Sequence, residues 1–222
     1  MNALKRLIII VVFLLISNAA YSQTASKIGN VYQIPFATEG NRVDLQVANV
    51  GDEEMAAVRV VTSQKPEWLH LDRGEIVISG VQSDTDAIAS FGFSVDREAP
   101  IGEGALLRFD IMSGNKVIGV KEFVLAVAPP SEAVLDQNFP NPFTQSTTIG
   151  FDNPVEGAVQ IAVYDMLGRQ VSVLLDEERA AGHHKVQWNA SGLASGMYFY
   201  ILKTNGKDGS VGLLRNKMII VH

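Results

Sequence analysis

Apolar residues alternate with polar ones through most of this 222-residue chain, and this period of two limits the fold to β-structure. Val43, Leu45 and Val47 alternate with Asp44 and Gln46, for example. Successive side chains of a strand point to opposite faces of the sheet, so this alternation indicates half-buried strands. Turn residues separate such runs about every 8–12 positions, and no amphipathic helical stretch interrupts them. We predict an all-β fold.

The first half of the chain, residues 23–128, repeats this pattern several times. The apolar members of the runs are Val43, Leu45 and Val47; Val58 and Val60; Ile76 and Ile78; Phe91, Phe93 and Val95; Leu107, Phe109 and Ile111. Short strands at even spacing favour an antiparallel sandwich. Residues 99–102 and 106–109 loosely resemble bacterial immunoglobulin-like accessory modules. We predict one immunoglobulin-like β-sandwich here.

Two consecutive prolines end the first half. Pro129 and Pro130 lie within the sequence Ala-Pro-Pro-Ser-Glu at residues 128–132. Prolines lack the N–H donor that a sheet needs and favour a stiff, extended linker. We predict that residues 129–132 link two domains and are accessible to proteases.

The second half, residues 133–222, is predicted to form a second immunoglobulin-like sandwich of seven strands. They are expected near residues 133–137, 147–152, 159–164, 169–175, 185–188, 197–203 and 213–221. Residues 165–168 predict a hairpin turn in which Gly168 adopts positive φ, and Asn189 is expected to cap another turn. The apolar end of the last strand fits a central strand buried on both faces. It also fits an edge strand that a partner could extend.

The N-terminus has the features of a secretory signal peptide. Lys5 and Arg6 precede the apolar run of residues 7–16, and small residues follow. The run is too short to span a bilayer as a helix, which takes roughly 20 apolar residues. We predict a signal peptide at residues 1–22, cleaved after Ser22 or alternatively after Ala19 or Ala20.

Charge and cysteine content exclude several functions. The net charge of −6 becomes −8 when residues 1–22, with their two basic side chains, are removed. An acidic chain without a basic run is unsuited to nucleic acid, whose phosphates need clustered Lys and Arg. The chain has no cysteine, so disulfides and thiolate metal sites are excluded.

The second half resembles the type A C-terminal sorting domains of the type IX (Por) secretion system. The resemblance rests on Asn-Phe-Pro-Asn-Pro-Phe at residues 138–143 and on segments 147–149, 163–169, 181–183, 186–188, 195–198 and 217–221. The motif residues that we expect to carry the sorting role are Asn138, Pro140, Asn141, Pro142, Phe143, Tyr164, Asp165, Gly168, Arg169, Gly182, Gly196, Tyr198 and Lys217. We expect Phe139 and Phe143 to anchor against the following sheet. Tyr164, Trp188, Tyr198 and Tyr200 alternate with small or polar residues, so we expect them to point into the sandwich. We expect Gly168, Gly182 and Gly196 to lie where a turn or a close backbone approach requires the absence of a side chain.

The resemblance implies a targeting role. Such domains carry an exported cargo from the periplasm across the outer membrane through the type IX translocon. A sortase-like protease usually removes them, and the cargo is then joined to a surface lipopolysaccharide or released. The sequence departs from the family at Thr144-Gln145, where Asn-Pro is common, and at His222, where a lysine-rich tail is common. A related pattern occurs in flagellar hook-capping proteins, but those lack a cleaved signal peptide.

The sequence offers little catalytic chemistry. It contains no His-Glu-x-x-His, no Gly-x-Ser-x-Gly and no glycine-rich phosphate loop. Adjacent His183 and His184 point to opposite faces of a strand, so we expect a structural role, with His184 facing solvent. Acidic residues gather in loops at 52–54, 84–86 and 176–178, and a weak calcium site at Asp84 and Asp86 is the alternative to plain solvation. We predict no enzyme activity and no cofactor.

The sequence therefore predicts a non-catalytic exported protein, located outside the cell or on the outer-membrane surface. Residues 23–128 would be a structural or adhesive cargo. The alternative is a surface carbohydrate- or protein-binding module with Trp68 as an exposed stacking platform. We expect Trp68 to be a buried cap over one end of the sandwich instead.

Overall fold

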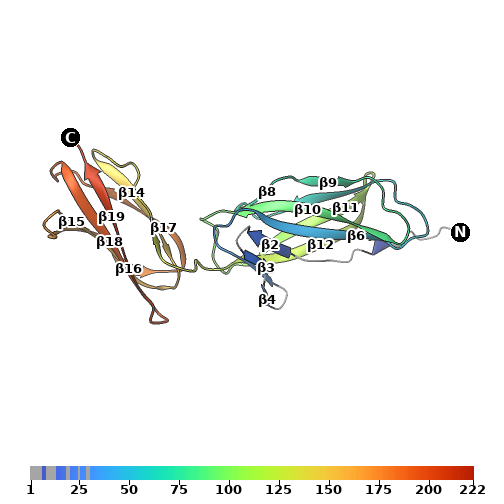
Figure 1. Cartoon of the computed structure of the whole chain (residues 1–222), viewed down its shortest axis with the longest axis horizontal. Coiled ribbons are helices and arrows are strands. Elements are labelled where there is room, and N and C mark those ends of the chain that lie inside the picture. Colours follow the sequence, from blue (N-terminus) through green and yellow to red (C-terminus); the bar gives the residue numbers. More distant parts are fainter. Residues whose placement is uncertain (1–6, 9–13, 19–20, 25, 29–30) are drawn as a thin grey trace. The chain divides into compact units, whose positions relative to one another are not determined.

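The computed structural model describes residues 7–8, 14–18, 21–24, 26–28 and 31–222, and this part of the chain is all β-structure. It contains no helix that could cross a membrane. The chain divides into two compact units, Met1–Ala128 and Pro129–His222, each built from two sheets (Figure 1). The predicted fold class is thus confirmed at the level of all-β structure.

The strands of the first unit form two sheets. The first sheet has the order β3-β2-β6-β10-β8, with β1 also paired to β6, and the second has the order β4-β5-β12-β11-β7-β9. The strand bounds are β1 Leu7–Ile8, β2 Leu14–Asn18, β3 Tyr21–Thr24, β4 Ser26–Ile28, β5 Val31–Ile34, β6 Asn41–Asn49, β7 Val58–Gln64, β8 Leu69–Leu71, β9 Glu75–Ile78, β10 Thr85–Val95, β11 Ala105–Ser113 and β12 Lys116–Val127.

The core of the first unit consists of the residues that the alternation placed on one face. Val43, Leu45 and Val47 of β6 are essentially buried and pack with Phe91 of β10 and Phe109 of β11. The rings of Phe91 and Phe109 lie 4.8 Å apart, centroid to centroid, and join one sheet to the other. Period-two burial on facing strands of two sheets thus produces a single hydrophobic layer.

The predicted signal peptide lies partly outside the described residues. Lys5, Arg6, Ala19 and Ala20 are not described, whereas parts of the apolar run form β1 and β2, which pair with β6. Cleavage after Ser22 stays a prediction.

The second unit contains the seven predicted strands. A three-stranded sheet, β13-β14-β17, faces a four-stranded sheet, β16-β15-β18-β19 (Figure 1). The bounds are β13 Val134–Leu135, β14 Ser146–Asn153, β15 Gly157–Tyr164, β16 Gln170–Arg179, β17 Gly182–Asn189, β18 Gly196–Gly206 and β19 Val211–Ile220. Most strands extend beyond the predicted ends. Strand pairing continues into polar residues, where no alternation of apolar and polar side chains marks the strand in the sequence.

The core of the second unit takes residues from both sheets. Phe151 and Trp188 from the three-stranded sheet pack with Ile161, Tyr200 and Met218 from the four-stranded sheet. Each of these five side chains is at most 8% exposed. The alternate residues on the same strands face outward, and they form the surfaces described below.

Candidate functional site

The segment Asn138–Phe143 lies between β13 and β14 in the chain and pairs with β14 of one sheet and with β19 of the other. Its first residue, Asn138, is buried. The Asn138 backbone N–H donates to the Tyr200 hydroxyl at 2.9 Å, and that hydroxyl donates to the Asp136 carbonyl at 2.6 Å. Burial raises the pKa of the Tyr200 hydroxyl above its ordinary value of 10.0, which keeps it protonated as a donor. Tyr200 on β18 therefore fixes the start of the segment.

The Asn138 side chain holds the segment in its bent path. Its amide nitrogen donates to the Pro140 carbonyl at 3.0 Å and to the Thr147 hydroxyl at 2.9 Å. The Thr147 hydroxyl in turn donates to the Pro140 carbonyl at 2.8 Å. The peptide bonds before Pro140 and Pro142 are both cis. A short side chain with two amide donors is what this closed triangle requires.

The other end of the segment binds the last strand. The Phe143 N–H donates to the Ile219 carbonyl at 3.1 Å, and the Val221 N–H donates to the Phe143 carbonyl at 2.9 Å. The Asn141 side-chain oxygen accepts from the Ile219 N–H at 2.9 Å. Phe143 is 3% exposed and packs edge-on against Trp188. Its predicted anchoring role is confirmed.

Phe139 differs from the prediction, since its side chain is 80% exposed. Its backbone N–H and carbonyl pair with Thr148 of β14, each at 2.9 Å. Side chains alternate along an extended segment, so the inward Asn138 forces Phe139 outward. Phe139 is the one aromatic ring in residues 31–222 that stands free in solvent.

The β15–β16 turn at Asp165–Arg169 is a small, fully bonded hairpin tip. One Asp165 carboxylate oxygen accepts from the backbone N–H groups of Leu167 and Arg169 at 2.9 and 3.0 Å. The other oxygen pairs with the Arg169 guanidinium at 2.7 Å. The pKa of Asp165 is held below its ordinary value of 3.8, first by the hydrogen bond from the Arg169 backbone N–H and then by those from the Arg169 guanidinium and the Leu167 backbone N–H. Gly168 has φ +75°, as predicted.

The other motif glycines differ from one another. Gly182 has φ +124°, a region that favours glycine, at the start of β17. Gly196 has neither positive φ nor a close neighbour, because an added Cβ would lie 3.9 Å from its nearest atom, in the Tyr198 ring. The expectation of a conformational requirement for glycine at position 196 is therefore wrong.

The aromatic residues of the motif face both ways. Tyr198, Tyr200 and Trp188 point inward as predicted, and the Tyr198 hydroxyl donates to the Ala194 carbonyl at 3.0 Å. Tyr164 was expected to point inward but lies half-buried on the outer face. The inward positions of β15 are taken by Val159, Ile161 and Val163, and this parity leaves the next residue outside.

Strand β19 is an edge strand, so of the two alternatives the central strand buried on both faces is wrong. It pairs with β18 alone in the sheet, and only Met218 and Ile220 of its residues are buried. Leu213 and Val211 are 66% and 78% exposed. The edge is covered near residues 217–221 by the Asn138–Phe143 segment and by Gln137, whose amide donates to the Lys217 carbonyl at 2.8 Å.

The structure thus brings part of the predicted site together. Residues 138–143 and Lys217 meet at β19, and Gly196 and Tyr198 pair with Ile220 and Met218 beside them. Tyr164, Asp165, Gly168 and Arg169 form the separate hairpin tip, and Gly182 pairs with Asn153 at the end of β17 remote from Trp188. Sequence reasoning placed Thr147 in a strand and in the matched segment 147–149, but it did not identify Thr147 or Gln137 as hydrogen-bond partners, because a single polar residue carries no signal of what its side chain bonds.

The histidine pair is built into the sheet. His183 Nδ1 lies 2.8 Å from the Asp152 carboxylate, with both side chains nearly buried. His184 stacks on the buried Phe151 ring, with centroids 5.2 Å apart, and its Nε2 contacts the Ala180 carbonyl. The two side chains lie on opposite faces, but the expectation that His184 faces solvent is wrong. Its cross-strand partner is a core residue, and the imidazole covers that ring.

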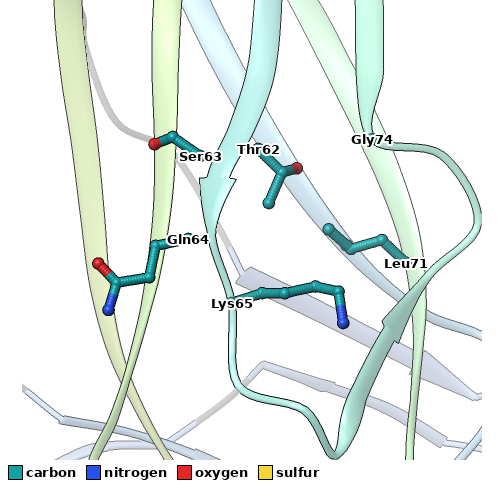
Figure 2. Close-up of a pocket in the computed structure, with 6 residues that line it drawn as sticks. All are labelled: Thr62, Ser63, Gln64, Lys65, Leu71 and Gly74. Carbon is teal, nitrogen blue, oxygen red and sulfur yellow. The ribbon is translucent and has the colours of Figure 1, made fainter.

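Residues 31–128 show a shallow pocket of about 270 Å³ at the end of β7 (Figure 2). The residues that line it are Thr62, Ser63, Gln64, Lys65, Leu71 and Gly74, which include no carboxylate and no imidazole. The Lys65 ammonium donates to the Leu69 carbonyl at 2.8 Å. In the described part of the chain, no three metal-binding side chains come together.

Trp68 and the acidic loops also have structural neighbours. Trp68 is half-buried and packs against the core of the first unit, as expected for a cap. Asp86 accepts from the Gln46 amide at 2.6 Å, and Asp176 accepts from the Gln160 amide at 3.1 Å. The expectation of loops at these positions is therefore wrong in part, because Asp86 lies within β10 and residues 176–178 lie within β16.

Comparison with known families identifies the second unit. Residues 137–220 match the family described as the secretion system C-terminal sorting domain. This confirms the predicted type IX sorting domain over those residues, and it implies export across the outer membrane to the cell surface or medium. The match covers the Asn138–Phe143 segment, the hairpin tip and all of β19.

Solved structures give weaker similarities. The chain is 15% identical to dimeric latent PorU from Porphyromonas gingivalis, with a TM-score of 0.34. The aligned region spans 84% of the chain described here and 19% of the PorU chain. A protein of unknown function from P. gingivalis W83 is 14% identical, with a TM-score of 0.33 and coverage of 86% and 94%. CopC from Methylosinus trichosporium OB3b is 14% identical, with a TM-score of 0.29 and coverage of 40% and 93%. These similarities are too low to support an argument. No curated protein matches the chain.

Proposed function

We propose that this protein is an exported cargo whose residues 133–222 form an immunoglobulin-like domain read by the type IX translocon, after removal of a signal peptide at residues 1–22. The match of residues 137–220 to the sorting-domain family carries this proposal. Two facing sheets with seven strands are consistent with an immunoglobulin-like fold. The motif residues would act by shaping the folded domain.

The open part of β19 is the proposed contact strand. Val211 and Leu213 are exposed on a strand without a second neighbour in its sheet, an arrangement that permits strand addition by a partner. The Asn138–Phe143 segment would set the length of that edge by covering its C-terminal end.

Residues 23–128 are proposed to be a non-catalytic structural or adhesive cargo in a second immunoglobulin-like sandwich. The proposal rests on two packed sheets and on a sequence without cysteine or a catalytic motif. The half-buried position of Trp68 gives no support to a sugar-stacking platform there. The alternative is a surface carbohydrate- or protein-binding module.

Residues 129–132 are the proposed site at which a sortase-like protease separates cargo from sorting domain. Ser131 and Glu132 are exposed, and neither belongs to a strand. The cargo would then be joined to a surface lipopolysaccharide or released.

A fusion experiment tests the targeting function. The signal peptide, a fluorescent protein and residues 129–222 are joined and expressed in a bacterium with a type IX system. We expect fluorescence in the medium or on the surface, and periplasmic retention would contradict the proposal. The matched control carries Phe143→Asp, which places a charge at a buried contact with β19 and should abolish export.

A further inference from the structure

The outer face of the four-stranded sheet in the second unit is unusually apolar. In register, Val173 of β16 lies opposite Ala162 of β15, which lies opposite Ile201 of β18. These residues alternate with the core residues of the same strands, so they point away from the core. Val173 is 46% exposed, whereas the small Ala162 between its two neighbours is only 2% exposed. An apolar row thus crosses three strands on the side that no sheet of this unit covers.

A second row runs beside the first. Tyr164 lies opposite Phe199, and Met197 lies opposite Ile219. Met197 is 38% exposed, and the two aromatic side chains are half-buried among their neighbours. Aromatic and methionine side chains concentrate in the cores of protein interfaces, whereas the solvent face of a free sheet is usually polar.

Cations border this face along β19. Arg215 lies opposite Ile201, and Lys217 lies opposite Phe199. Lys203 of β18 adds a third cation, opposite the exposed Leu213. Within the described residues, none of the three forms an ion pair. The outward residues of β15, β18 and β19 include no carboxylate, whereas Asp176 and Glu178 lie on β16, opposite Gln160 and Ala158. The cations therefore border the β19 side of the face, and the carboxylates lie on its β16 side.

We propose that this face docks a protein partner that presents apolar side chains bordered by carboxylates. The apolar rows would be buried in the centre, and the unpaired Arg215 and Lys217 would meet the partner's acidic border. The proposal rests on the proposed sorting function, and it assigns the partner's contact to the sheet face in addition to the β19 edge.

Photo-crosslinking in secreting cells tests the docking face with the full-length chain. A benzophenone side chain replaces Met197 in the face, Leu213 near the edge or, as control, Gln187 on the opposite sheet. We expect a covalent adduct with a second protein from positions 197 and 213 and none from 187. An adduct from 213 alone would indicate contact with the edge only and would overturn the proposal. A product of twice the chain mass would assign the face to a second copy and would also overturn it.

Charge reversal tests the chemistry of the partner. The double variant Arg215→Glu, Lys217→Glu should reduce the adduct from position 197 at least tenfold at an unchanged melting temperature. Lys185→Glu on the opposite sheet should leave the adduct unchanged. An undiminished adduct in the double variant would overturn the proposal, as would the absence of any adduct from a chain that is secreted. If the unaltered chain is not secreted at all, the sorting function itself fails, so the two failures are distinguishable.

Discussion

A single hydroxyl joins the start of the sorting motif to the core. Tyr200 is completely buried and bonded to backbone groups of residues 136 and 138, more than 60 positions earlier in the chain. The hydroxyl satisfies the Asn138 N–H and the Asp136 carbonyl, which are buried away from water. Removing it would leave both backbone groups without a hydrogen-bond partner.

The variant Tyr200→Phe should destabilise the second unit by about 1–3 kcal/mol, the usual penalty for buried groups left without a partner. Urea denaturation in a Trp68→Phe background measures it, because Trp188 then reports on the second unit. Tyr164→Phe is the matched control: its hydroxyl contacts the Gln170 side chain at the surface, and its loss should change stability by less than about 0.5 kcal/mol. Equal effects of the two variants would contradict this account.

Asp165 makes the stability of the hairpin tip depend on pH. Its pKa is lower in the folded state than the ordinary value of 3.8, so the folded state favours the carboxylate. The contribution is present above the unfolded-state pKa of about 4 and is lost as the pH falls through the lower folded-state value.

We therefore expect Asp165→Asn to lower the melting temperature at pH 7, with the difference from the parent protein shrinking as the pH falls through the lowered folded-state pKa of Asp165. Thermal melts from pH 7 to pH 2.5 measure this difference. Asp176→Asn is the control, since the exposed Asp176 carboxylate bonds to one amide side chain only. A difference that persists unchanged at the lowest pH would show that the carboxylate charge is not the cause.

Strand pairing explains why one glycine outside the motif matters more than one inside it. A Cβ on Gly157 of β15 would lie 2.1 Å from the Asn205 carbonyl oxygen on β18. At that distance the two backbones must separate. The same substitution at Gly196 of β18 meets no atom closer than 3.9 Å.

The variant Gly157→Ala should cost about 1–3 kcal/mol or more, as overpacking does, whereas Gly196→Ala should leave stability nearly unchanged. Hydrogen exchange of β15 and β18 amides checks this, with faster exchange expected near residues 157–159 in the first variant only. If Gly196→Ala blocks export without altering stability, the motif glycine serves recognition and not folding.

Much of this element-scale picture could be predicted from the sequence. Alternation and turn residues located β14 to β19 because each strand buries one face. The same reasoning could not place β19 within its sheet. The apolar end at residues 218–221 suits a buried centre and a capped edge equally, and the capping segment comes from residues 138–143. The side-chain direction of Phe139 was mispredicted because the prolines at positions 140 and 142 interrupt the alternation of apolar and polar residues on which such a prediction depends.

At the scale of the whole molecule, the division falls between Ala128 and Pro129. Residues 128–133, which have no strand structure, separate β12 from β13. Partner choice could not be predicted at this scale, because the face of β15, β18 and β19 emerges only when the register aligns residues some 40 positions apart.

Limited proteolysis should therefore separate the chain first within residues 128–133. Brief proteinase K digestion followed by mass spectrometry is expected to give two stable fragments on either side of that interval. An early cut inside residues 137–220 would contradict the assignment of those residues to one compact unit. Replacing Ser131 and Glu132 by prolines is the control, since it should delay the first cut without altering the later ones.

The hydrogen bonds between Phe143 and residues 219 and 221 have a consequence for the order of folding. The segment that opens this domain finds these partners only after β19 has been synthesised and has paired with β18. A polypeptide that lacks residues 219–221 leaves Asn141 and Phe143 without their partners, so the closure of the first segment depends on the last strand of the sheet.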